Sequence, residues 1–330
     1  MKALVYTGPK AMAYQDVPAP RSSADVSLVQ IQSVGICGSD MHGYLGHDDR
    51  RPAPLILGHE GAGVVESGPL AGSRVTINPM VTWLECEACL EGRVNLCPNR
   101  QLLSMPPREG AFADFVAIPA RNLTVIPDTL SFDHAALAEP LAVCWHSVRL
   151  GLEAVFGAND DVKALVIGGG AIGVGSALCL HANGVVDITV SEPNPVRAEA
   201  LKSIGSFKVS DPNAAPLKDS HYDLVIDAVG FGGTRANASA TVKPGGVIVH
   251  VGLGDSSEGF DVRRATLQEI TFIGTYTYTN EDFTQTVDGL ANGLFGSLDW
   301  YETRPLSEGA QAFADILAGK VSAPKIILRP

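Results

Sequence analysis

The sequence has little basic charge, few cysteines and no long apolar run. It holds 24 basic and 36 acidic residues among 330, a net charge of −12, so nucleic-acid and anionic-membrane partners are not expected. No apolar run approaches the roughly 18 residues that a membrane-spanning helix needs. Residues 1–6 predict a first strand rather than a signal peptide. Six cysteines are too few for a disulfide scaffold, and we expect a protein of the reducing cytoplasm.

The length of 330 residues favours two domains, and the pattern of the chain changes near residue 139. The first part contains short β-like runs separated by Gly and Pro turns, which predicts an irregular β domain. Helical and strand-like runs alternate in the second part, which is typical of βαβ units and a parallel sheet. We predict an α/β protein with domains at 1–138 plus 277–330 and at 139–276. The last apolar run, 325–328, is expected to pair with the first domain.

A glycine motif follows the apolar run 163–167. Gly168, Gly170 and Gly173 are spaced as G-x-G-x-x-G, and the helix-compatible run 171–182 begins at once. In a dinucleotide-binding turn these glycines allow a tight bend, close approach of a pyrophosphate, and close packing of helix on strand. Such triplets are common in ordinary turns. Here Glu192 ends the next apolar run, which completes the context that the motif requires.

Four side chains are usable ligands for a catalytic metal: Cys37, His59, Glu60 and Glu139. A catalytic zinc typically has three protein ligands and an open position. Cys37 and His59 lie in Gly-flanked segments, where side chains from separate loops can converge. The alternative for each residue taken alone is a buried thiol and a core histidine.

The segments around these residues resemble a known family. Residues 35–42 (GICGSDMH) and 57–65 (LGHEGAGVV) resemble the signature of zinc-containing alcohol dehydrogenases, in the medium-chain dehydrogenase/reductase superfamily. Residues 138–143 (AEPLAV) are similar to the third-ligand segment of its polyol branch, which includes sorbitol and threonine dehydrogenases. The resemblance covers essentially the whole chain. It implies a GroES-like catalytic domain and a Rossmann domain with a doubly wound parallel sheet.

The resemblance implies a role for each candidate ligand. Cys37 and His59 would bind zinc, Glu139 would be the third ligand, and Glu60 would be a neighbouring carboxylate that can enter or leave the coordination. Which of the two glutamates binds at rest stays open. Asp40 would accept the free ring N–H of the ligating histidine and so orient it; the alternative is a turn-capping aspartate.

The same resemblance implies a route for the proton of the substrate. Ser39 matches the hydroxyl that relays the proton of the alcohol, and His42 could carry that proton outward. For His42 the alternative is an ordinary loop histidine.

A cysteine cluster departs from the family pattern. Cys86, Cys89 and Cys97 match the last three positions of its four-cysteine structural zinc lobe, but Trp83 stands at the first. Structural zinc sites are nearly always closed by four ligands, and an indole nitrogen is only a donor. A second zinc is therefore doubtful. The favoured alternative is a lobe without metal that keeps its shape by packing Trp83.

The cofactor is predicted to be NAD. Glu192 would accept hydrogen bonds from ribose hydroxyls and repel the extra phosphate of NADP, and no Arg or Lys follows it immediately. The expected cofactor contacts are Gly168, Gly170, Ala171, Ile172, Gly173, Glu192, Arg197, Val251 and Thr275, and the family resemblance adds Val229.

Together these features predict a zinc-dependent dehydrogenase that transfers hydride between NAD and a secondary alcohol. The small-molecule substrate is expected to be a polyol, a sugar alcohol or a sugar acid. By resemblance the protein would be a homodimer or homotetramer. Two alternatives remain open, namely a zinc-independent quinone or enone reductase of the same superfamily, and a non-catalytic NAD-binding protein.

Overall fold

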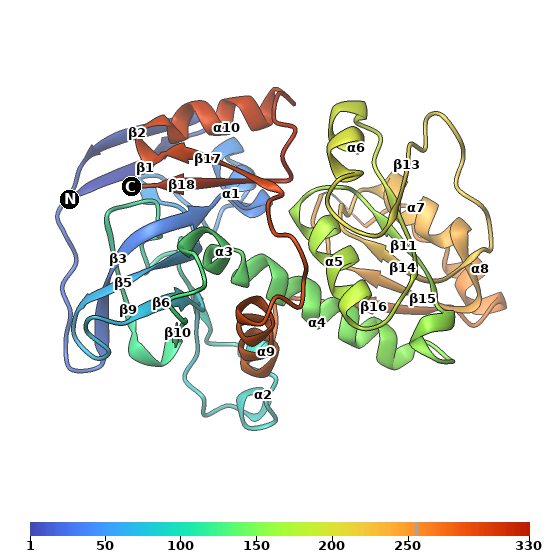
Figure 1. The fold of residues 1–330 in the computed structure, drawn as a ribbon, viewed down its shortest axis with the longest axis horizontal. Helices are drawn as coiled ribbons and strands as arrows, with labels where there is room; N and C mark the ends of the chain where they lie inside the picture. The colour runs from blue at the N-terminus through green and yellow to red at the C-terminus, as the bar shows by residue number, and fades with distance from the viewer. Residues whose placement is uncertain (255–256) are drawn as a thin grey trace. The chain divides into compact units, whose positions relative to one another are not determined.

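The structure, a computed structural model, describes residues 1–254 and 257–330, which divide into two units (Figure 1). The first unit comprises Met1–Pro140, Thr279–Asn292 and Tyr301–Pro330. The second comprises Leu141–Tyr278 and Gly293–Trp300. Among the described residues no helix is both long enough and apolar enough to cross a membrane.

The first unit is a β structure built mainly on one seven-stranded sheet, in which β10-β6-β5-β3-β18-β17 are neighbours and β9 pairs with β3. A three-stranded sheet, β2-β1-β4, and the pair β7–β8 complete it. The strands are β1 (Lys2–Gly8), β2 (Ala11–Asp16), β3 (Val26–Gly35), β4 (Leu55–Ile56), β5 (Glu60–Ser67), β6 (Arg74–Ile77), β7 (Met80–Val81), β8 (Gln101–Leu102), β9 (Phe115–Pro119), β10 (Leu123–Val125), β17 (Tyr301–Pro305) and β18 (Lys325–Arg329).

Alternating burial along the strands produces the core of this unit. In β3 the side chains of Ser27, Val29, Ile31 and Ser33 are buried, as expected for a strand whose successive side chains point to opposite faces. The helices and 3-10 turns of this unit are α1 (Gly38–Leu45), α2 (Glu87–Leu90), η1 (Val94–Leu96), η2 (Ala120–Asn122), α3 (Phe132–Ala136), α9 (Asn280–Ala291), η4 (Leu306–Glu308) and α10 (Gly309–Leu317).

The C-terminal strand returns to the first unit. β18 pairs antiparallel with β3, with Ile327 opposite Gly35 and Leu328 opposite Val34. The predicted pairing of the last apolar run is therefore confirmed. This pairing brings the beginning of β18 next to the segment that follows β3, where the first predicted zinc ligand lies.

The second unit is a six-stranded parallel sheet in the order β13-β12-β11-β14-β15-β16. Numbered within the unit this order is 3-2-1-4-5-6, the doubly wound order of dinucleotide-binding folds, so the predicted fold class is confirmed. The strands are β11 (Lys163–Ile167), β12 (Asp187–Ser191), β13 (Lys208–Ser210), β14 (Tyr222–Asp227), β15 (Val242–His250) and β16 (Thr271–Gly274). The remaining helices are α4 (Ala138–Ala154), α5 (Ala171–Ala182), α6 (Pro195–Leu201), α7 (Gly232–Thr241) and α8 (Val262–Leu267), with the 3-10 turn η3 (Asn159–Asp161).

Candidate active site

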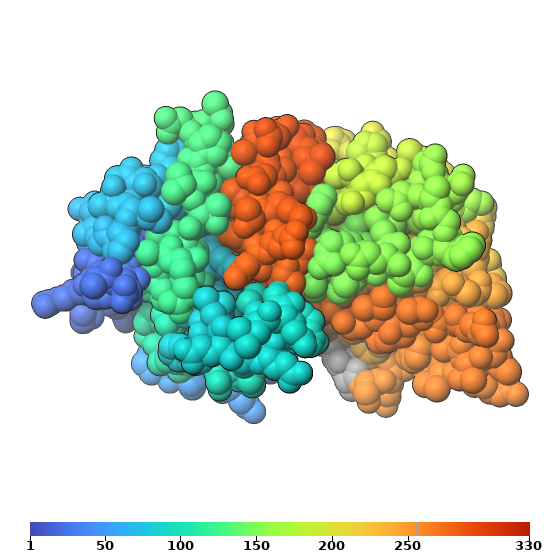
Figure 2. Space-filling model, turned by 90° about the horizontal axis from the view of Figure 1, so that it is seen from below, coloured from blue at the N-terminus to red at the C-terminus, as the bar shows by residue number. Residues whose placement is uncertain are grey.

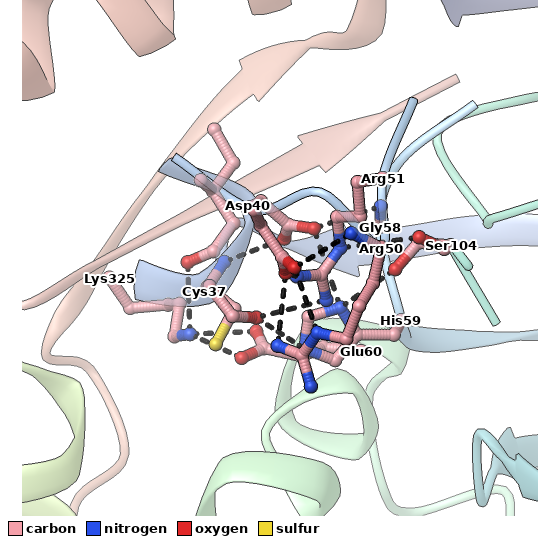
Figure 3. Close-up of polar contacts among 12 residues, drawn as sticks. Cys37, Asp40, Arg50, Arg51, Gly58, His59, Glu60, Ser104 and Lys325 are labelled. Atoms are coloured by element: carbon pink, nitrogen blue, oxygen red, sulfur yellow. Dashed lines mark hydrogen bonds and ion pairs between the residues drawn. The ribbon is translucent and has the colours of Figure 1, made fainter. Parts of the chain in front are cut away.

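Three predicted ligands of the catalytic metal lie together in the first unit (Figure 3). One ligand atom from each of Cys37, His59 and Glu60 falls within 4.8 Å of the other two. Strand pairing explains the arrangement, because Gly35 at the end of β3 lies opposite Glu60 at the start of β5. A Cβ at Gly35 would lie 2.0 Å from Glu60 Oε2, so a larger residue there would displace the Glu60 carboxylate from its present position.

Asp40 orients this cluster through both carboxylate oxygens. Its Oδ2 accepts the Cys37 N–H at 3.0 Å, its Oδ1 accepts the Gly58 N–H at 3.2 Å, and Oδ1 lies 3.4 Å from His59 Nδ1. Burial alone would raise the pKa of Asp40, but the neighbouring His59 and Arg51 hold it below its ordinary value. Asp40 is therefore a charged acceptor for Nδ1–H, which leaves the Nε2 lone pair of His59 for a metal.

The His59 ring has hydroxyl neighbours on both sides. Ser104 Oγ lies 3.4 Å from Nδ1, and Ser39 Oγ lies 3.5 Å from Nε2. Ser39 and His42 are three residues apart on α1, a spacing that places both on one face of the helix. His42 is half-buried, and its side chain makes no hydrogen bond to any described residue. The relay from Ser39 to His42 thus stays a prediction.

Lys325 is a partner of the cluster that the sequence analysis missed. Its Nζ, in β18, donates to both Glu60 oxygens at 2.7 Å and to the Ile36 carbonyl at 3.0 Å. The Lys325 and Glu60 side chains are 2% and 0% exposed. Burial lowers the pKa of Lys325, but Glu60, Cys37 and Glu139 raise it above its ordinary value. The only sequence feature that could have indicated this role is a lysine at the start of an apolar strand. Its partner Glu60 lies 265 residues away in the chain.

The donor set fits a zinc ion. Thiolate, imidazole and carboxylate are its usual ligands, and a catalytic site keeps one position open. Cys37 and His59 supply the first two donors. Glu139 is buried at the start of α4, and its charge acts on Lys325, the partner of Glu60. Because Lys325 already binds both oxygens of Glu60, Glu139 is the better candidate for the third ligand.

The cysteine lobe forms a second group of possible ligands. The sulfur atoms of Cys86, Cys89 and Cys97 lie within 4.8 Å of one another, and those of Cys86 and Cys89 are 3.4 Å apart. Trp83 is 53% exposed. The lobe does not keep its shape by packing Trp83, which corrects the alternative considered above; its buried cluster is Met80, Cys89, Val94 and Cys97. The segment that contains these cysteines, cyan in Figure 2, lies at the surface of the molecule.

The glycine turn of the second unit has the geometry of a phosphate-binding turn. Gly168 has φ +99°, and a Cβ on Gly173 would lie 1.8 Å from the Gly168 carbonyl oxygen, so neither position accepts another residue. A Cβ on Gly170 would meet no atom within 4 Å, which leaves open space for a ligand. Gly170 is the N-cap of α5 without a side-chain cap, and the first helical residues are Ala171 and Ile172. The N–H groups of this helix start are therefore available for an anion.

Glu192 connects this turn to the next strand. Its Oε2 accepts the Gly169 N–H at 2.9 Å, and its Oε1 accepts the Asn194 N–H at 2.8 Å. Arg197 Nη1 lies 3.4 Å from Oε2. The carboxylate thus holds the backbone of the turn itself, a role that the sequence analysis did not assign. Buried carboxylate oxygens retain further lone pairs, so ribose hydroxyls remain possible donors.

The other predicted cofactor contacts follow the carboxyl ends of neighbouring parallel strands. Val229 follows β14, Val251 follows β15, and Thr275 follows β16, where its Oγ1 lies 2.9 Å from Ser147 Oγ. Ligands collect at this edge of an open α/β sheet. Buried Asp227, which the sequence analysis did not single out, accepts the N–H groups of Val229 and Gly230 at 3.1 and 2.9 Å and so shapes this edge.

Comparison with known proteins agrees with this geometry. Residues 23–128 match the alcohol dehydrogenase GroES-like domain, and residues 171–292 match the zinc-binding dehydrogenase family. The sorbitol dehydrogenase of Bacillus subtilis (strain 168) is 31% identical over 89% of this chain and 87% of its own length. The chain belongs to the zinc-containing alcohol dehydrogenase family. The L-galactonate-5-dehydrogenase of Escherichia coli (strain K12) is 30% identical over 89% of this chain and 88% of its own length.

A solved structure leads to the same assignment. The short chain alcohol dehydrogenase of Escherichia coli CFT073, solved with NADH, superimposes with a TM-score of 0.91 at 25% identity, covering 100% of this chain and 99% of that one. The predicted family, its polyol branch and its zinc and nicotinamide chemistry are confirmed. This dehydrogenase is an enzyme that acts on CH–OH groups of small-molecule alcohols.

Proposed function

We propose that this dehydrogenase oxidises a secondary alcohol of a polyol, sugar alcohol or sugar acid, with NAD as hydride acceptor. The observation that carries the proposal is the Cys37, His59 and Glu60 cluster, in which Asp40 Oδ1 lies 3.4 Å from His59 Nδ1 and so leaves Nε2 as the nitrogen for a metal. Cys37, His59 and Glu139 would hold the zinc, with Glu60 as a neighbouring carboxylate that can enter or leave the coordination. A zinc ion there supplies Lewis-acid polarisation of the substrate oxygen.

The protein residues provide orientation and proton transfer. Asp40 keeps Nδ1–H of His59 engaged and so fixes the tautomer of the ligand. Ser39 takes the hydroxyl proton of the alcohol as the C–H hydride leaves, and His42 on the same helix face passes that proton outward. The oxidation therefore releases one proton to the solvent and transfers one hydride to the nicotinamide.

The cofactor preference rests on Glu192. It is buried beside the glycine turn, where a carboxylate would repel the additional phosphate of NADP. Arg197 is already close to the Glu192 carboxylate at 3.4 Å, which reduces its attraction for such a phosphate. The contacts proposed for NAD are the predicted glycines, Ala171, Ile172, Glu192, Arg197, Val229, Val251 and Thr275.

Three further properties are part of the proposal. The catalytic domain would comprise residues 1–138 and 277–330, and the NAD-binding domain residues 139–276. The protein would be a homodimer or homotetramer. A cytoplasmic location agrees with the free thiols of Cys37, Cys86, Cys89, Cys97, Cys144 and Cys179.

A substrate screen tests the proposal. Sorbitol, 2,3-butanediol, L-galactonate, L-idonate and galactitol 1-phosphate would each be offered with NAD or NADP, following formation of the reduced cofactor. We expect turnover of at least one polyol or sugar acid, with NAD preferred by kcat/KM about 100-fold or more. Turnover of enones or quinones, with none of any alcohol, would favour the reductase alternative. Binding of NAD without any turnover would favour the non-catalytic alternative.

A further inference from the structure

A buried arginine that belongs to no predicted site, Arg51, contacts Ser39, the serine proposed as the proton relay. The Arg51 side chain is 2% exposed, in the segment between α1 and β4 (Figure 3). Its Nη1 donates to Asp48 Oδ2 at 2.5 Å, its Nε to the Ser104 carbonyl at 3.2 Å, and its Nη2 to Ser39 Oγ at 3.5 Å. All three nitrogens of the guanidinium therefore have a partner.

The surrounding residues are shaped to hold this cation. A Cβ on Gly43, a buried residue of α1, would lie 2.9 Å from Arg51 Cδ. Glycine in a helix interior costs about 1 kcal/mol relative to alanine, and here it leaves room for the arginine stem. Burial alone would raise the pKa of Asp48, but Arg50 and Arg51 hold it below its ordinary value. Arg51 thus has a charged partner, as a buried cation requires.

Arg51 contacts both residues whose hydroxyls lie beside His59, Ser39 through its hydroxyl and Ser104 through its backbone carbonyl. Its Nη2 reaches Ser39, which lies 3.5 Å from His59 Nε2. Its Nε binds the backbone of Ser104, whose hydroxyl lies 3.4 Å from His59 Nδ1. A guanidinium presents its donors in a rigid planar fork, so one rigid group contacts both of these residues.

We propose that Arg51 is a positioning residue for the proton relay. By donating to Ser39 Oγ it occupies one lone pair of that oxygen and directs the hydroxyl hydrogen away from the guanidinium. By holding Ser104 it fixes the opposite side of the His59 ring. The inference rests on the proposed role of Ser39 as the relay.

The test is a double-mutant cycle with Arg51→Met and Ser39→Ala, using the alcohol from the screen above that is turned over fastest. We expect Arg51→Met to lower kcat by about 10-fold to 100-fold, the size of effect that misplacement of a reacting group produces. KM should change by less than about 3-fold, and zinc content, measured by mass spectrometry of the metal, should equal that of the wild type. Adding Arg51→Met to Ser39→Ala should lower kcat no further, because both changes remove one relay.

Matched variants separate positioning from folding. Arg51→Lys keeps the charge but loses the fork, and we expect a loss in kcat smaller than that of Arg51→Met. Asp48 keeps Arg50 as a partner, at 2.8 and 3.0 Å, when Arg51 is changed. Arg74→Lys is the control, because Arg74 also donates to a backbone carbonyl of the first unit, that of Leu130. The Arg74→Lys variant should retain the wild-type kcat.

Three results would overturn the inference: unchanged kcat in Arg51→Met, a fall in zinc content parallel to the fall in kcat, or losses that multiply in the double variant. Failure of the proposed relay gives a different result, because Ser39→Ala would then retain the wild-type kcat by itself.

Discussion

The two candidate metal clusters of this dehydrogenase each hold three possible ligands within 4.8 Å, but their surroundings differ. Around Cys37, His59 and Glu60, further buried side chains fix each donor: Asp40 contacts the histidine, and Lys325 binds the glutamate. Around Cys86, Cys89 and Cys97 the described contacts are mostly among the thiols themselves and with apolar neighbours. Ligand spacing alone therefore does not distinguish a working metal site. The difference lies in the groups that hold the ligands.

The largest loss of activity should follow from changing a ligand in the cluster of Cys37, His59 and Glu60. We expect Cys37→Ser or His59→Ala to lower kcat/KM by about 1000-fold or more, since Lewis-acid stabilisation is worth several kcal/mol. Bound zinc should fall with the activity. Cys97→Ser in the second cluster is the matched change and should leave kcat/KM within about 3-fold of the wild type. Steady-state kinetics and metal analysis of the variants would test this. An equal loss of kcat/KM in the variants of both clusters would contradict the difference between the two clusters.

The buried ion pair should contribute most to stability. Lys325→Met leaves the Glu60 carboxylate buried without its cation, and breaking such a pair costs about 3–5 kcal/mol. Urea unfolding followed by tryptophan fluorescence measures the loss. The double variant Lys325→Met with Glu60→Gln should recover much of it, because the uncompensated charge is gone. A double variant as unstable as the single one would mean that lysine packing, rather than pairing, is what matters.

Completing the second cluster should change its metal content. The wild-type chain is expected to bind about one zinc, and Trp83→Cys about two, because four thiolates close a structural site. Trp83→Phe is the control for loss of the indole. Two zinc ions in the wild-type protein would show that Cys86, Cys89 and Cys97 bind zinc without a fourth thiolate, and would contradict this prediction.

The smallest effect concerns thiol reactivity. Hydrogen bonds from Cys89 lower the pKa of Cys86, whereas burial raises the pKa of Cys89 to about 11. A lower pKa means more thiolate at a given pH, so iodoacetamide should modify Cys86 before Cys89 as the pH rises from 7 to 9. Cys37 should resist until zinc is removed. Peptide mass spectrometry gives the order, and rapid modification of Cys37 in the zinc-loaded enzyme would argue against its role as a ligand.

The features that could be predicted from the sequence are those formed by residues close together in the chain. The glycine turn, the strand before it and the helix after it are local patterns, and the structure has them at Lys163–Ile167 and Ala171–Ala182. Cys37, His59 and Glu60 could be grouped because residue types and family resemblance pointed to them. The short strand β13 (Lys208–Ser210) was missed, since three residues carry almost no periodicity.

The residues that hold the cluster could not be found in this way. Lys325 reaches Glu60 only because β18 pairs with β3. Arg51 reaches Ser104 across 53 residues, and Ser104 reaches His59 across 45. No sequence motif connects Lys325, Arg51 and Ser104, because they lie in separate segments of the chain. Their roles become visible only when the strands are paired and the side chains are buried.

Zinc removal tests the account most directly. The purified enzyme would be dialysed against a chelator, its metal content measured, and NADH formation followed with the fastest alcohol from the screen, before and after adding one equivalent of Zn²⁺. We expect turnover to disappear as zinc is removed and to return with that equivalent, while Cys97→Ser behaves like the wild type. Undiminished turnover in zinc-free protein would contradict it.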